Sequence, residues 1–137
     1  MLFQIKRTVL FGDCDPAGAI YAPRAADFIV EAVLAFLSSI LTGPAVMKLF
    51  DMDIRPPARS LVIEFLSRLT WDDVLDLEVT CSHIGNTSFG CTVHARRQDS
   101  VLALTGVLTQ VCIAPSTGMP IALPDKLRRA LVTARLR

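Results

Sequence analysis

Two aspartates in a short segment near the N-terminus are the residues best placed to carry out chemistry. The segment reads FGDCDPAGAIY over residues 11–21, which puts Asp13 and Asp15 two positions apart. It lies between a strand pattern and the start of a long apolar helix pattern. Free backbone N–H groups and the positive end of the helix dipole are found at such a helix start, where they polarise a carbonyl group. A carboxylate placed opposite that carbonyl could attack it or activate a water molecule.

The same two aspartates also have purely structural interpretations. Asp15-Pro16 is a common sequence for a helix N-cap followed by proline at the first helical position. Asp13 can equally close an Asx turn. The two carboxylates have the spacing of a metal pair, but no further ligands lie nearby in the sequence. These alternatives stay open from the residues alone.

The elements that must position the aspartates are one long helix and five strands. Apolar residues alternate over residues 3–11, which predicts a half-buried strand. From Arg24 to Leu41 the polar side chains other than Ser39 occupy one narrow stripe, so this helix must be wrapped by protein on most sides. Its uncharged run is too short for a membrane span. Four further strands are predicted over residues 61–66, 75–83, 88–96 and 101–113, and a short basic helix over residues 124–137.

This order of elements predicts an α+β fold in a single domain over residues 1–137, with an antiparallel sheet curled around the buried helix. Apolar residues make up 52% of the chain and charged residues 20%, which excludes a disordered protein. The net charge of +1 predicts neither nucleic-acid nor membrane-surface binding. Because the chain is rich in apolar residues and has only three glutamates, part of its exterior is expected to be covered by a partner subunit.

The cysteines and histidines predict no metal site. Four cysteines are scattered without C-x-x-C spacing, and each is interpreted as a small buried hydrophobic residue. His83 and His94 lack cysteine partners at zinc-ligand spacing. The N-terminus has no secretory layout, so reduced thiols and a cytoplasmic location are expected. No G-x-G-x-x-G or P-loop sequence is present, so no nucleotide cofactor is expected.

The segment FGDCDPAG at residues 11–18 closely resembles the signature of the 4-hydroxybenzoyl-CoA thioesterase family of hotdog-fold proteins. Residues 57–78 resemble the second and third strands of that family, and Thr87-Ser88-Phe89 resembles the opening of its fourth strand. The resemblance implies a hotdog fold, with five strands wrapped around one long helix. It also implies hydrolysis of an acyl-CoA or related pantetheine thioester to the free acid and CoA, without a metal or an organic cofactor.

The resemblance implies roles for individual residues as well. Asp15 matches the family's catalytic aspartate, which acts as nucleophile or as general base. The backbone N–H near Ala22 matches the donor that polarises the thioester carbonyl. The positions that match substrate-binding positions are Tyr21, Ala22, Pro23, Arg24, Ser60 and Ser88. The family forms dimers that pair into tetramers, with sites built across the dimer interface, so a homodimer or homotetramer is expected.

The sequence also departs from the family pattern near the helix start. Ala22, Arg24 and Ala25 stand where tyrosine or histidine, asparagine, and an aromatic residue are common, so an unusual acyl group is expected. Gly85-Asn86 occupies a turn where the hydroxybenzoyl enzyme carries basic residues for the nucleotide phosphates, which leaves a carrier-protein thioester as an alternative substrate. A non-catalytic acyl-thioester binding module and a dehydratase acting on hydroxyacyl thioesters are the further alternatives.

Overall fold

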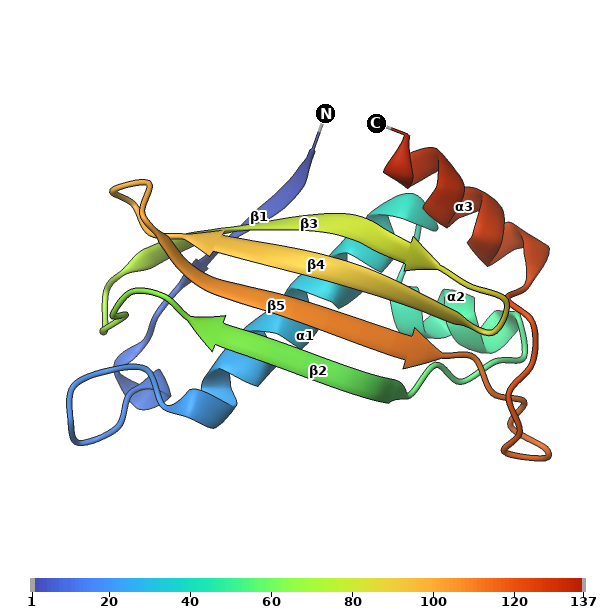
Figure 1. Cartoon of the computed structure of the whole chain (residues 1–137), viewed down its shortest axis with the longest axis horizontal. Coiled ribbons are helices and arrows are strands. Elements are labelled where there is room, and N and C mark those ends of the chain that lie inside the picture. The colour runs from blue at the N-terminus through green and yellow to red at the C-terminus, as the bar shows by residue number, and fades with distance from the viewer. Residues whose placement is uncertain (1, 137) are drawn as a thin grey trace.

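A five-stranded antiparallel sheet with one long helix across it forms the body of the protein in the computed structural model, which describes residues 2–136 (Figure 1). The strands are β1 (Phe3–Thr8), β2 (Ala58–Phe65), β3 (Val74–Ile84), β4 (Ser88–Arg96) and β5 (Leu102–Val111). The helices are α1 (Ala22–Ile40), α2 (Ala45–Asp51) and α3 (Asp125–Arg135), with a 3₁₀ turn, η1, at Phe11–Asp13.

The strand order in the sheet is β1-β3-β4-β5-β2, and every neighbouring pair is antiparallel. The strands β3, β4 and β5 therefore form the interior of the sheet, and β1 and β2 are its edges. The expected five-stranded antiparallel sheet with one long buried helix is confirmed. The run over residues 101–113, which is apolar on both faces, forms the interior strand β5.

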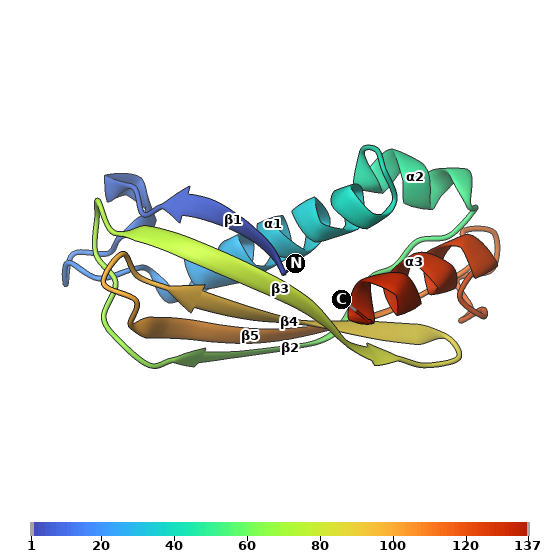
Figure 2. The same cartoon turned by 90° about the horizontal axis from the view of Figure 1, so that it is seen from above.

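Helix α1 lies diagonally across one face of the sheet (Figure 2). Phe28, Ile29 and Leu37 are fully buried against the sheet, whereas Asp27 and Glu31 lie exposed on the predicted polar stripe. The helix approaches the sheet closely at Gly106 of β5, where a Cβ atom would lie 2.6 Å from Cδ1 of Ile29. Glycine at this position therefore allows the helix to pack directly onto the strand.

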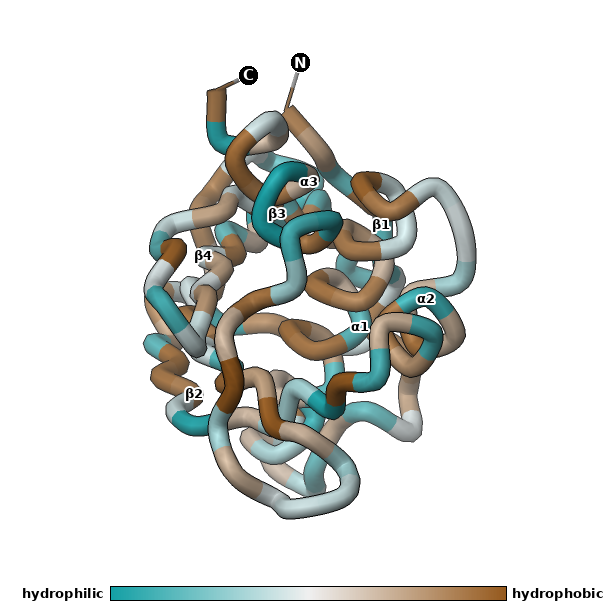
Figure 3. The backbone as a smooth tube through the Cα atoms, turned by 90° about the vertical axis from the view of Figure 1, so that its right-hand side faces the viewer, coloured by the Kyte–Doolittle hydropathy of each residue, from teal (hydrophilic) through white to brown (hydrophobic). Residues whose placement is uncertain are grey.

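The predicted basic helix near the C-terminus is confirmed as α3, although Arg137 lies outside the described residues. Leu127 and Leu131, on the inward face of this helix, are fully buried. Arg128 of α3 donates a hydrogen bond from Nη2 to the carbonyl of Gly85, at a distance of 2.8 Å, in the turn between β3 and β4. Figure 3 shows α3 beside β3 in the upper part of the view.

None of the helices in residues 2–136 is by itself long and apolar enough to cross a membrane. Helices α1 and α2 satisfy the length and composition criteria only when they are taken together, and they are bent by 62° at the break between them. Most of the apolar side chains of α1 are buried against the sheet.

Candidate active site

The segment between β1 and α1 folds as the turn η1 followed by a tight loop. Cys14 and Ile20 pair through an antiparallel bridge, which closes the loop at its base. Inside the loop the Asp15 N–H donates to the Ala19 carbonyl at 2.9 Å, and the Gly18 N–H donates to the Asp15 carbonyl at 2.9 Å. Gly18 has a φ of +80°, which glycine adopts at little cost. The backbone around Asp15 is therefore fixed by hydrogen bonds within the loop.

The Asp15 side chain is half-buried and closes an Asx turn, because its Oδ1 accepts a hydrogen bond from the Ala17 N–H at 2.9 Å. The interpretation of Asp15-Pro16 as an N-cap and first helical residue is wrong. Helix α1 begins later, with Tyr21 as its N-cap and Pro23 in its first turn. The other carboxylate oxygen of Asp15, Oδ2, makes no hydrogen bond with any residue that the structure describes.

Asp13 has the opposite environment, since its side chain is only 6% exposed. Its Oδ2 accepts hydrogen bonds from the Leu10 N–H at 2.9 Å and from Nη1 of Arg7 at 3.3 Å, while Nε of Arg24 lies 3.8 Å from Oδ1. The main-chain carbonyl of Asp13 accepts the Tyr21 N–H at 2.8 Å. The Asx-turn interpretation of Asp13 is therefore wrong, because its carboxylate accepts hydrogen bonds from Arg7 and Leu10, which precede it in the chain. The same carboxylate pairs with Arg24 and so connects these residues to the start of α1.

Arg7 on β1 is a structural partner of the site that sequence reasoning missed. Its Nε donates to Glu31 of α1 at 3.0 Å, and its guanidinium carbon lies 4.2 Å from the centre of the Phe28 ring. Burial lowers the pKa of Arg7, but the hydrogen bonds and charges of Glu31 and Asp13 outweigh this effect, so the pKa is raised above its ordinary value. Arg7 therefore stays charged and holds β1, the turn η1 and α1 together. In sequence, Arg7 has the same strand parity as the apolar residues Phe3 and Ile5, so a charged residue on the inward face of the strand was the signal that could have identified it.

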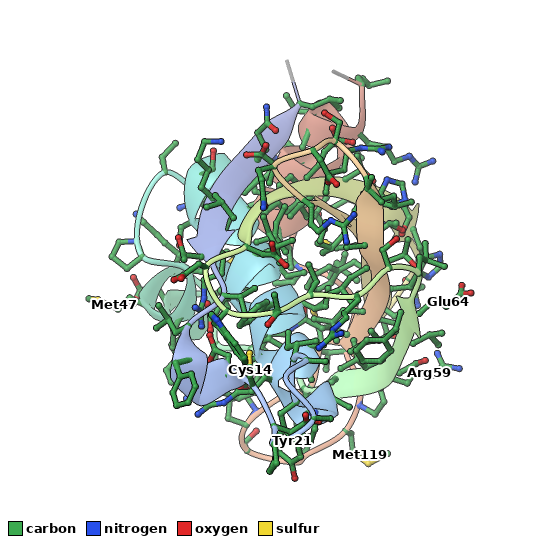
Figure 4. The ribbon with its side chains drawn as sticks, turned by 90° about the vertical axis from the view of Figure 1, so that its left-hand side faces the viewer. Cys14, Tyr21, Met47, Arg59, Glu64 and Met119 are labelled. Carbon is green, nitrogen blue, oxygen red and sulfur yellow. The ribbon has the colours of Figure 1, made fainter. Side chains whose placement is uncertain are left out.

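The start of α1 presents an unpaired backbone donor. Tyr21 makes no capping hydrogen bond through its side chain, and Pro23 has no N–H. The Arg24 N–H donates to the Tyr21 carbonyl at 2.8 Å, whereas the Ala22 N–H has no acceptor among the residues that the structure describes. Tyr21, Ala22, Pro23 and Arg24 are all exposed. Figure 4 shows Cys14 and Tyr21 near the start of α1, and Arg59 and Glu64 on β2 to one side.

The loop is also anchored to the connection between β2 and β3. Nη2 of Arg68 donates to the carbonyls of Ala17 and Gly18, at 3.3 and 3.1 Å. The Trp71 ring contacts the Phe11 ring, with 5.6 Å between the ring centres. Arg68 is about fifty residues from the loop in sequence, so nothing in the local pattern indicated this contact. These contacts with residues 68–71 therefore add to the hydrogen bonds within the loop in fixing its position.

Two of the predicted substrate-binding residues, Ser60 and Ser88, lie far from Asp15 in the folded chain. Ser88, at the start of β4, is buried, and its Oγ lies 3.1 Å from Nε2 of His83. Ser60 is exposed near the start of β2. In Figure 1, β2 and β4 both begin at the end of the sheet near α2 and α3, whereas the loop of Asp15 lies at the opposite end. A single chain therefore does not bring Ser60 or Ser88 to Asp15.

Three of the four cysteines lie in the interior of the protein. Cys81, Cys91 and Cys112 are buried, as expected, and Cys14 is half-buried. Burial raises the pKa of Cys91 to about 12, so this thiol stays protonated at neutral pH and is a poor nucleophile. Among residues 2–136, no three histidine, cysteine, aspartate or glutamate side chains gather in a group that could hold a metal ion.

Comparison with known proteins connects this arrangement to a family. The family model of the thioesterase-like superfamily matches residues 9–131, which include the loop of Asp15, the whole of α1 and the entire sheet apart from β1. The chain belongs to the thioesterase-like superfamily. No curated protein matches its sequence. The expected family resemblance is confirmed, and it supports thioester hydrolysis as the reaction class.

Three solved structures illustrate the fold of this superfamily member. Protein SAV2348 from Staphylococcus aureus in complex with CoA has a TM-score of 0.91 and 16% identity, covering 99% of this chain and 85% of that chain. The 1,4-dihydroxy-2-naphthoyl-CoA thioesterase Slr0204 from Synechocystis has a TM-score of 0.86 and 22% identity, covering 96% of both chains. A thioesterase superfamily protein from Jannaschia sp. CCS1 has a TM-score of 0.87 and 26% identity, covering 97% of this chain and 92% of that chain. The expected hotdog fold is confirmed.

Proposed function

We propose that this chain hydrolyses an acyl-CoA thioester to the free acid and CoA, with Asp15 as nucleophile or general base. One observation carries the proposal: a half-exposed carboxylate with an unbonded oxygen lies in the loop that leads directly into an uncapped helix start. A thioester carbonyl placed between them would meet the Ala22 N–H and the positive end of the α1 dipole on one side. The Asp15 carboxylate would face its carbon from the other side, either directly or through a water molecule.

Both forms of the reaction balance with water as the only co-reactant. As nucleophile, Asp15 forms an acyl anhydride and expels the CoA thiolate, and water then releases the acid and restores the carboxylate. As general base, Asp15 takes a proton from water while the oxygen of that water bonds to the carbonyl carbon. The thiolate leaves and takes up a proton in either case. The helix start stabilises the oxyanion in both forms.

The residues around the helix start supply the proposed binding surface. Tyr21, Ala22 and Pro23 are exposed beside the loop and would line the thioester. The Arg24 side chain is about half exposed and lies 3.4 Å from Asp27, so we propose that it can turn from this partner to an anionic group of the substrate. CoA is favoured over a carrier-protein thioester because SAV2348 was solved in complex with CoA and Slr0204 is a 1,4-dihydroxy-2-naphthoyl-CoA thioesterase.

A second copy of the chain is needed to complete the proposed site. β2 is an edge strand, and the apolar side chains Leu61, Val62 and Phe65 on it are 37%, 56% and 50% exposed. A long apolar edge strand is a template for pairing with another chain. If two β2 strands paired antiparallel, the start of one strand, which carries Ser60, would lie beside the end of the partner strand. The end of β2 is the part of the strand that lies nearer the loop of Asp15 (Figure 1). We propose a homodimer of this kind, alone or within a homotetramer, with a site at each end of the shared edge.

The proposal is tested by thiol release from aromatic, short-chain and long-chain acyl-CoAs, with wild-type protein and with Asp15→Asn. Asn keeps the shape of the side chain and an acceptor for the Ala17 N–H but removes the charge, so the variant should fold normally and lose at least about 100-fold in kcat. Asp51→Asn, which changes an exposed aspartate at the end of α2 in the same way, is the matched control. Unchanged turnover in Asp15→Asn would remove Asp15 from the mechanism.

Two other outcomes would redirect the function. Absence of thiol release from every CoA ester, with release from carrier-protein thioesters, would favour the carrier substrate. Tight binding of acyl-CoA without release of any thiol would favour a binding module.

A further inference from the structure

Two cysteines, Cys81 and Cys91, lie directly opposite each other on the neighbouring interior strands β3 and β4. Both belong to the hydrophobic core, with Cys81 6% exposed and Cys91 fully buried. Burial raises the pKa of Cys91, and the Cys81 thiol raises it further, so the two sulfur atoms are close enough to interact. Neither thiol takes part in the proposed hydrolysis of a thioester.

The hydrogen bonds of β4 show which kind of cross-strand pair the two cysteines form. The Cys112 N–H donates to the Thr87 carbonyl at 2.8 Å, so these two residues are a hydrogen-bonded pair at the start of β4. Hydrogen-bonded and non-hydrogen-bonded pairs alternate along an antiparallel ladder, and the register of β4 on β5 is continuous from there to Cys91 and Leu108. Cys91 therefore directs its N–H and C=O toward β5. On its other side it forms a non-hydrogen-bonded pair with Cys81.

A pair of this kind has the backbone geometry that a disulfide requires. The Cα atoms of a non-hydrogen-bonded antiparallel pair lie about 4.5 Å apart, and a disulfide needs a Cα separation of about 4.4–6.8 Å. Sγ of Cys81 lies 3.8 Å from the carbonyl oxygen of His83, further along the same strand. Rotation about the Cα–Cβ bond of Cys81 is therefore the movement that brings its sulfur to Cys91, and the strands need not separate.

A hollow of about 80 Å³ borders Cys81 and lies between β1, β3, the end of α1 and α3. Phe3, Ile40 and Arg135 are among the residues that line it. Its volume holds a few molecules of the size of water, so it admits hydrogen peroxide and excludes a bulky oxidant such as oxidised glutathione. Burial raises the pKa of Cys81, but the hydrogen bond to the His83 carbonyl and the charge of Arg135 oppose this effect. Cys81 is thus the thiol of the pair that has both an opening and a cation nearby.

We infer that Cys81 and Cys91 are a peroxide-sensitive dithiol, in which Cys81 reacts first and Cys91 closes a disulfide between β3 and β4. The Cys81 thiolate attacks one peroxide oxygen, so an S–O bond forms, the O–O bond breaks, and the hydroxide that leaves takes up a proton. The Cys91 sulfur then bonds to the Cys81 sulfur, and the hydroxyl group leaves with the Cys91 proton as water. The two thiols lose two electrons and two protons in total, and the peroxide is reduced to two water molecules.

The position of Cys91 compensates for its weak nucleophilicity. Its raised pKa makes it a poor nucleophile toward molecules in solution. Because it is fixed opposite Cys81, its attack on the oxidised sulfur takes place within one molecule and needs no access from solvent. The inference is independent of thioester hydrolysis, so failure of either one leaves the other standing.

The sequence offers a direct measurement, because the tryptic peptide over residues 69–96 contains Cys81, Cys91 and no other cysteine. The folded wild-type protein is treated with hydrogen peroxide, then unfolded in iodoacetamide, digested and analysed by mass spectrometry. This peptide should lose two hydrogen atoms and take up no alkyl group. The oxidised protein should also melt about 5–10 °C higher than the reduced protein, because the disulfide restricts the unfolded chain, and dithiothreitol should reverse the shift.

Three variants test the order of the two steps. Cys112→Ala, which removes a buried cysteine outside the pair, is the matched control and should form the same disulfide. Cys91→Ala should stop at a sulfenic acid on Cys81, which dimedone traps, whereas Cys81→Ala should leave Cys91 unmodified. A peptide 69–96 that stays reduced in the folded wild type, under conditions that oxidise the denatured chain, would overturn the inference. Dimedone labelling of Cys91 in Cys81→Ala would overturn the assigned order. The wild-type measurement needs no substitution, so it decides the question even if a variant fails to fold.

Discussion

Replacement of Asp13 tests the electrostatics of the site most directly. Its buried carboxylate carries a negative charge between Arg7 and Arg24. Asp13→Ala removes that charge and leaves the Arg7 guanidinium and the Leu10 N–H without their shared acceptor. Removal of one partner of a buried ion pair costs about 3–5 kcal/mol, and a buried donor left unsatisfied costs about 1–3 kcal/mol.

The surroundings of Asp13 place the expected effect below the sum of these two costs. The side chains of Arg7 and Arg24 are 24% and 48% exposed, so water solvates part of the charge that the substitution leaves unpaired. Arg7 also keeps its ion pair with Glu31 at 3.0 Å. We therefore expect Asp13→Ala to lower the free energy of unfolding by about 2–4 kcal/mol. Asp13→Asn retains an oxygen for the Leu10 N–H and should cost about 1–2 kcal/mol.

Urea unfolding followed by circular dichroism measures both variants against Asp76→Asn as a matched control. Asp76 pairs with Lys6 at 2.8 Å on the exposed side of β1 and β3. Loss of an exposed pair of this kind should cost less than about 1 kcal/mol. An Asp13→Ala variant that is as stable as Asp76→Asn would refute the view that the Asp13 carboxylate ties β1 to the start of α1.

Two further predictions concern the edge strand and a buried thiol. Val62→Lys puts a charge on the exposed edge strand, so light scattering should show a monomer, and thiol release by this variant should be reduced. Ser116→Lys, in an exposed turn, is the control and should leave the dimer intact. A Val62→Lys variant that remains a dimer would contradict pairing through β2. Burial raises the pKa of Cys91 from 9.0 to about 12, so between these values the folded protein keeps a proton that the unfolded chain loses, and stability should fall as pH rises above about 9. Thermal unfolding from about pH 8 to about pH 11 should show a steeper loss for wild type than for Cys91→Ala; equal slopes would exclude this linkage.

The helix and the strands could be predicted from the sequence because their signals are local. The polar stripe through Asp27 and Glu31 fixes which face of α1 is exposed, and the alternation in β1, β3 and β4 fixes which residues of those strands face the helix. The packing of Ile29 onto Gly106 could not be predicted, because it depends on where the helix crosses the sheet.

The environments of the two aspartates could not be read from the sequence because their deciding partners are distant or depend on backbone conformation. Asp13 is buried only because Arg7 and Arg24 approach it from a strand and a helix. Asp15 followed by proline has the local chemistry of an N-cap, yet Gly18 turns the chain into a closed loop before the helix begins. The residue types marked both aspartates as candidates and the family resemblance selected Asp15, but the half-exposed position of Asp15 depends on the three-dimensional fold.

The start of α1 lacks the groups that normally stabilise a helix N-terminus, and this deficiency is consistent with the proposed chemistry. The Tyr21 side chain makes no capping hydrogen bond, the first turn has no acidic residue, and Arg24 places a cation there. A capping Ser, Thr, Asp or Asn would contribute about 1 kcal/mol. The charge of Arg24 is offset instead by Asp13 and Asp27, whose carboxylates pair with its side chain. A side-chain cap would compete for the helix start at which the thioester carbonyl must bind, so the stability missing from this end of α1 leaves the Ala22 N–H available to the substrate.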